Sequence, residues 1–143
     1  MATNLPRILF ICRANTGRSQ IAEAYYRELT GGYAESRGYD VDQPGKTLNE
    51  EPRANDTIAV MAEEGIDIRG QLRLPLLESD LANFDLLVVL APTAEWPGWL
   101  QGEPDALEWS MVDPVNFDRD QTRITRDDIK DHVKELILEL EAK

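Results

Sequence analysis

The chain has 143 residues, a hydrophobic fraction of 42% and a formal net charge of −12 at pH 7. This length is close to the commonest size of a single domain, so residues 1–143 are expected to form one domain. The negative charge repels nucleic-acid phosphates and anionic membranes, so neither is expected as a partner. One cysteine and one histidine can form neither an internal disulfide nor a structural zinc site, and no metal or cofactor is expected.

Apolar runs alternate with helical patterns along the chain. The predicted strands are Arg7–Ile11, Tyr33–Ser36, Leu86–Leu90 and Leu107–Val112. The predicted helices are Arg18–Leu29, Arg53–Glu64 before Gly65, and a last helix that Thr125 caps and that runs to Leu140. Leu86–Leu90 is apolar at every position, which is typical of a strand covered on both faces of a parallel sheet. The alternation predicts a doubly wound, three-layer α/β domain, with Tyr39–Glu51 as a surface loop.

The stretch from Cys12 to Ser19 joins the first predicted strand to the first predicted helix. Cys12 and Arg18 enclose five residues, which are Arg13, Ala14, Asn15, Thr16 and Gly17. Backbone N–H groups of such a loop, together with the positive end of the following helix, form an anion site that also stabilises a thiolate. Arg18 offers a planar fork of donors for two phosphoryl oxygens. In this interpretation Cys12 is a nucleophile; the alternative is a small, buried hydrophobic residue.

Three further features have a functional and a structural interpretation. Asp113 follows the strand predicted at Leu107–Val112, so it reaches the same sheet edge as Cys12 and is a candidate proton donor, or else part of an ordinary Asp-Pro turn. His132 lies within the last helix and is expected at the surface. Trp96 and Trp99 fit a rim packed against the core better than a substrate wall.

Several of these motifs together resemble the low-molecular-weight protein tyrosine phosphatase superfamily, which includes arsenate reductases of the same fold. They are Cys12-x5-Arg18-Ser19, the "AEA" that follows, "AES" at Ala34–Ser36, "EEGIDI" at Glu63–Ile68 and Asp113-Pro114. The resemblance implies a central four-stranded parallel sheet flanked by helices. It also implies that Cys12 is the nucleophile, Arg18 binds the phosphoryl oxygens, Ser19 tunes the thiolate, Asn15 shapes the loop and Asp113 is acid and then base.

The leading hypothesis is a cytoplasmic, metal-independent phosphomonoesterase that acts through a phosphocysteine on a phosphotyrosine protein or a small aryl phosphate. The first alternative is an arsenate reductase, because "RSQIAEA", "GIDIRGQ" and Trp109 resemble that branch. Its thioredoxin-linked members use two further cysteines, whereas the corresponding region here offers Ala91 and Trp96. A reductase would therefore need an external thiol such as glutathione, mycothiol or a redoxin. The second alternative is an anion-binding relative without turnover.

Overall fold

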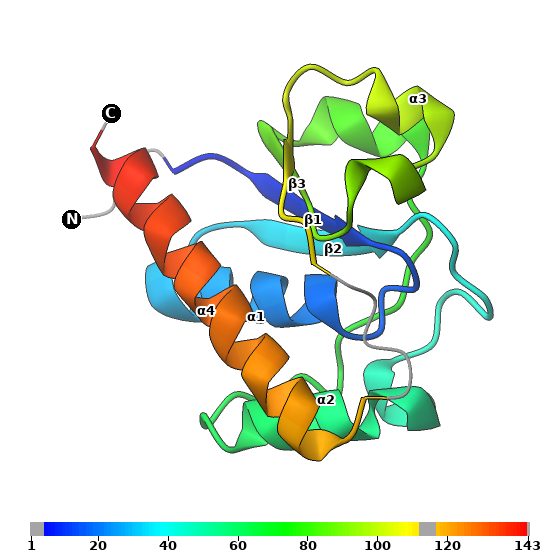
Figure 1. Ribbon diagram of the computed structural model, residues 1–143, viewed down its shortest axis with the longest axis vertical. Coiled ribbons are helices and arrows are strands. Elements are labelled where there is room, and N and C mark those ends of the chain that lie inside the picture. Colours follow the sequence, from blue (N-terminus) through cyan, green and yellow to red (C-terminus); the bar gives the residue numbers. More distant parts are fainter. Residues whose placement is uncertain (1–4, 112–116, 143) are drawn as a thin grey trace.

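The computed structural model describes residues 5–111 and 117–142, and its centre is a four-stranded parallel sheet (Figure 1). The strands are β1 (Ile8–Cys12), β2 (Ala34–Gly38), β3 (Leu86–Val89) and β4 (Ala106–Glu108), in the order β2-β1-β3-β4. The predicted α/β fold with a four-stranded parallel sheet flanked by helices is thus confirmed. No helix of the described residues is both long and apolar enough to span a membrane.

Helices cover one face of the sheet, and shorter segments cover the other. The longer helices α1 (Arg18–Thr30), α2 (Asn55–Ala62) and α4 (Arg119–Glu141) share one face, and α3 (Gly98–Gln101) lies across the sheet from them (Figure 1). The 3-10 turns are Leu48–Glu50, Pro52–Ala54, Glu78–Asn83 and Thr93–Glu95. Because side chains alternate along β1, Ile8 and Phe10 enter the core beneath the long helices, while Leu9 and Ile11 pack with Trp96 and Leu100 on the opposite face.

The strand order places the carboxyl end of β1 at a special point of the sheet. From β1 the chain passes through α1 to β2 on one side, while β3 pairs with the other side of β1. The direction of winding therefore reverses beside β1, and ligands of open α/β sheets bind outside the strand ends at such a point. Cys12 is the last residue of β1.

Most predicted strands and helices begin and end within two residues of those in the structure, but some end elsewhere or are divided differently. β4 ends at Glu108, well before the predicted end. The single helix predicted over Arg53–Glu64 is a 3-10 turn followed by the shorter α2. The polar loop Tyr39–Glu51 contains a 3-10 turn and an isolated bridge between Thr47 and Leu72.

The predicted start of the last helix is wrong. Asp118, not Thr125, is the N-cap of α4: its Oδ1 accepts the Gln121 N–H at 2.8 Å, and Gln121 Oε1 accepts the Asp118 N–H at 3.0 Å. Thr125 lies inside the helix, where its hydroxyl donates to the Gln121 carbonyl. Asp118-x-x-Gln121 is a capping box of its own, and the mostly polar residues between it and Thr125 hide the first two turns from an analysis based on apolar spacing.

Replacing Asp118 by alanine is expected to lower the free energy of unfolding by about 1 kcal/mol, because the Gln121 N–H in the first turn of α4 loses its side-chain acceptor. Thr125→Ala is the matched control and is expected to change it by less than about 0.5 kcal/mol. Urea unfolding of the two variants measures both values. A larger loss for Thr125→Ala than for Asp118→Ala would contradict the cap assignment.

Candidate functional site

Residues Arg13–Gly17 form the loop between β1 and α1, here called the anion loop. Groups outside the loop hold four consecutive carbonyl oxygens: Cys12 O accepts from Tyr39 N at 3.0 Å, Arg13 O from Asp40 N at 2.8 Å, Ala14 O from Arg73 Nη2 at 2.9 Å and Asn15 O from Gln20 Nε2 at 3.0 Å. In a trans peptide the carbonyl and the next N–H point in opposite directions. Four outward carbonyls therefore aim four amides, from Arg13 to Thr16, toward the opposite side.

The inward side of the anion loop has the character of an anion site. Among the described residues, no protein acceptor takes the backbone N–H groups of Ala14, Asn15, Thr16 or Gly17. α1 starts directly afterwards at Arg18 and adds the positive end of its dipole. This arrangement fits a tetrahedral oxyanion.

Asn15 fixes the shape of the anion loop. It is fully buried and has φ = 57°, the left-handed conformation that asparagine tolerates better than most residues. Its side-chain amide donates to Ser19 Oγ at 2.8 Å and Ser36 Oγ at 3.0 Å, and its Oδ1 accepts the Leu74 N–H at 2.9 Å. The left-handed residue of the loop is therefore Asn15, whereas Gly17 has a negative φ of −133°.

The thiol of Cys12 has a defined hydrogen-bond partner. Its Sγ lies 3.0 Å from Ser19 Oγ, and the cysteine is 2% exposed. Because Asn15 already donates to Ser19 Oγ, the serine proton is available for the sulfur, an arrangement that stabilises a thiolate.

A second branch of hydrogen bonds leads from Asn15 to a buried carboxyl group. Ser36 accepts from Asn15 and donates to Glu23 Oε1 at 2.7 Å, while Arg27 pairs with Glu23 Oε2 at 2.5 Å. Burial raises the pKa of Glu23, and the hydrogen bond from Ser36 and the charge of Arg27 oppose that shift. Cys12 is thus connected to Glu23 through Ser19, Asn15 and Ser36.

Arg18 is tied to the carboxyl edge of the sheet. Its Nη1 donates to the carbonyl oxygens of Leu90 at 2.7 Å and Met111 at 2.9 Å, and the side chain is 2% exposed. These contacts fix the guanidinium at the wall of a cavity of about 630 Å³ that the anion loop also lines. Binding of two oxyanion oxygens by Arg18 stays a prediction.

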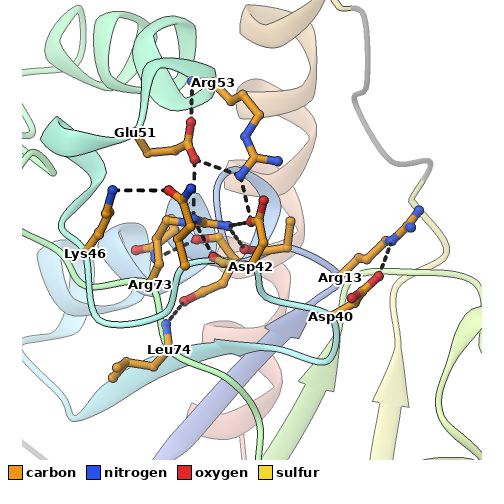
Figure 2. A network of polar contacts seen from close by, with 12 residues as sticks. Arg13, Asp40, Asp42, Lys46, Glu51, Arg53, Arg73 and Leu74 are labelled. Atoms are coloured by element: carbon orange, nitrogen blue, oxygen red, sulfur yellow. Dashed lines mark hydrogen bonds and ion pairs between the residues drawn. The ribbon is translucent and has the colours of Figure 1, made fainter.

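Several charged residues lie on the outer walls of this cavity. They include Asp40, Asp42, Arg53 and Asp56, and Phe117 is the only aromatic residue among the described ones that line it. Figure 2 shows the ion pair between Arg13 and Asp40, at 3.2 Å, beside a larger network around Arg73. No group of three or more His, Cys, Asp or Glu side chains that could hold a metal ion occurs in residues 5–111 and 117–142.

Other candidates from the sequence lie elsewhere. Asp113 falls outside the described residues, so its role stays a prediction. His132 is at the surface of α4, with its ring 5.2 Å from that of Trp109. Trp96 is buried in the core and donates to the Ala91 carbonyl at 2.9 Å, while Trp99 is more exposed. Neither tryptophan lines the cavity.

Sequence reasoning missed the residues that support the anion loop from outside. Arg73 is fully buried although it is charged, and its place between apolar residues in "LRLPLL" is the signal that could have indicated a buried ion pair. Gly38 is also required, since an added Cβ would lie 2.6 Å from Arg13 O and 2.9 Å from Asn15 N. Gln20 and Ser36 lie within the motifs "RSQIAEA" and "AES", but their spacing alone assigns neither of them a role.

Residues 7–95 match the family model "Low molecular weight phosphotyrosine protein phosphatase". The chain belongs to this family. It is 27% identical over 139 residues to a protein of Synechocystis sp. named "Glutaredoxin arsenate reductase". The match covers 95% of this chain and 99% of the relative. An arsenate reductase solved in its phosphate-binding state is 28% identical, with a TM-score of 0.71 over 94% of this chain and 98% of its own. A solved protein tyrosine phosphatase shares the fold at 21% identity, with a TM-score of 0.79 over 96% of this chain and 97% of its own.

The hydrogen bond between Ser19 and the sulfur can be tested by alkylation. Ser19→Ala is expected to slow modification of Cys12 by iodoacetamide at pH 7 about tenfold, because a hydrogen bond to a charged group contributes about 1.5–3 kcal/mol. Mass spectrometry over time gives the rates, and Ser79→Ala, at an exposed serine, is the control. Equal alkylation rates for Ser19→Ala and the wild-type chain would show that Ser19 does not support the thiolate.

Proposed function

We propose that this protein is an arsenate reductase that uses Cys12 as nucleophile and an external thiol as reductant. One arrangement carries the proposal. The sulfur of Cys12, hydrogen-bonded to Ser19, stands at the start of a loop, and the loop amides point away from four carbonyls that are bound on the other side. Curated relatives that match most of the chain are named arsenate reductases, which supports the choice of substrate.

The described cavity walls offer little ring contact to an aromatic phosphate ester. A ring-bearing substrate gains affinity from aromatic and apolar walls. Here Phe117 alone among the described lining residues offers a ring. Arsenate needs only the loop amides and the Arg18 guanidinium.

In the proposed first step, the Cys12 thiolate attacks arsenic(V) and an arsenate oxygen leaves as water after protonation. A thiolate RS⁻ then attacks the Cys12 sulfur. The new S–S bond replaces the S–As bond, whose electron pair stays on arsenic, and arsenite(III) leaves. A second thiol reduces the mixed disulfide and regenerates Cys12, so two thiols lose the two electrons that arsenic gains.

The reductant must come from outside the chain, because Cys12 is the only cysteine. The region where thioredoxin-linked reductases carry further cysteines holds Ala91, which is fully buried, and Trp96, whose indole is bound to the Ala91 carbonyl. Glutathione with glutaredoxin is the first donor to test, since the Synechocystis relative is named a glutaredoxin arsenate reductase.

Phosphomonoester hydrolysis is the second candidate function. A phosphatase needs no second thiol, and this chain has none. In that reaction Cys12 would attack phosphorus, Asp113 would protonate the leaving oxygen, and water would cleave the phosphocysteine.

One preparation should be tested for both reactions. We expect arsenite formation with glutathione and glutaredoxin, and only trace hydrolysis of p-nitrophenyl phosphate. Parallel reactions use thioredoxin or mycothiol with mycoredoxin, and Cys12→Ser is expected to abolish arsenite formation with every donor. Cys12-dependent hydrolysis with no arsenite from any donor would reverse the ranking of the two functions.

A further inference from the structure

Arg73 is a charged residue in the interior, outside the set of groups to which the proposed reaction assigns a chemical step. Its side chain is fully buried. Backbone bonds hold it on both sides, because the Arg73 N–H donates to Lys46 O and the Gly45 N–H donates to Arg73 O, both at 2.8 Å. A buried cation is costly unless it is paired and hydrogen-bonded, so the partners of this guanidinium indicate what it does.

The guanidinium joins the anion loop to the segment that follows β2. Nη2 donates to Ala14 O and to Asp42 Oδ1, both at 2.9 Å, and Nη1 donates to Asp42 O at 3.0 Å and lies 3.4 Å from Glu51 Oε1. Arg53 binds the same two carboxylates, at 2.8 Å and 2.7 Å. Figure 2 shows Asp42 between the two arginines, with Glu51 also reaching both.

We propose that Arg73 is a positioning residue of the anion loop: by holding the Ala14 carbonyl outside, it turns the Asn15 N–H toward the bound oxyanion. The Ala14 carbonyl and the Asn15 N–H belong to one planar trans peptide, so fixing one group fixes the direction of the other. Of the four tethers on the loop carbonyls, this is the only one from a charged side chain, and charge-assisted hydrogen bonds are the stronger kind.

Asp42 extends this function to the cavity wall. It is 61% exposed on its side chain, lines the cavity and binds Arg73 from the outer side. Hydrogen bonds from Arg53 and Arg73 lower the pKa of Asp42 to about 2. This carboxylate therefore stays ionised and paired with Arg73 at neutral pH. Because Arg73 itself donates to the Ala14 carbonyl, loss of the Asp42 charge is expected to weaken this hydrogen bond less than loss of Arg73.

The inference rests on the proposed function only in that the loop must bind a tetrahedral oxyanion. The test measures the dissociation constant for inorganic phosphate by calorimetry, without turnover. Arg73→Lys keeps the charge and loses the planar fork, and is expected to weaken phosphate binding at least tenfold. Asp42→Asn is expected to weaken phosphate binding by a smaller factor. If Arg73→Lys fails to fold, Asp42→Asn still tests the tether, because it leaves no internal void.

Two controls separate positioning from stability. Arg69→Lys changes an exposed arginine, paired with Asp67 in the same segment, and is expected to bind phosphate within twofold of the unmodified chain. Leu136→Ala, at a buried position toward the end of α4 and outside the cavity lining, lowers stability and is expected to leave phosphate affinity unchanged well below its melting temperature.

Each result decides a separate point. Folded Arg73→Lys and Asp42→Asn that bind phosphate as the unmodified chain does would overturn the positioning role and leave the proposed function standing. Weakened phosphate binding in these variants, with no arsenite from the unmodified chain, would support the positioning role and reject the proposed function. An unmodified chain that binds no phosphate would overturn both.

Discussion

The planar trans peptide is the constraint on which the site depends. A loop of five residues can present its amides to an anion only if its carbonyls are satisfied on the other side. Here two backbone N–H groups and two side chains hold the four carbonyls from Cys12 to Asn15. The direction of the amides is therefore a result of tertiary structure, and the Cys12-x5-Arg18 sequence alone does not ensure it.

The donors for these carbonyls come from distant parts of the chain that the fold brings together. Tyr39 and Asp40 follow β2, and β2 pairs with β1 in register up to Cys12 and Gly38. Gly38 lets the backbone of β2 approach the anion loop closely, since any side chain at this position would clash with the loop. Arg73 belongs to a segment that pairs with residues after β2. The sheet order that places β1 between β2 and β3 thus also determines which groups can reach the loop.

The local part of the site could be predicted from the sequence, and the long-range part could not. The strand, loop and helix around Cys12 follow from an apolar run, a short polar stretch and helical spacing, all within about twenty residues. Arg73 and Gln20 act through contacts with loop carbonyls, and no spacing rule indicates which buried donor meets which carbonyl. Polar residues in the first turns of α4 carry little periodic signal, so apolar spacing predicts the start of this helix too late. Asp113 lies outside the described residues, so its part in the chemistry stays a prediction.

Phosphate and arsenate share shape and charge, so both candidate reactions depend on the same loop, and its binding of a tetrahedral oxyanion is the central claim. The most direct measurement is a titration of Cys12→Ser with phosphate, followed in ¹H–¹⁵N spectra. The backbone amide signals of Ala14, Asn15 and Thr16 are predicted to shift together and saturate, while those of Ala106–Glu108 on the edge strand stay in place. Saturable shifts confined to other residues, or loop signals that do not respond, would contradict the account.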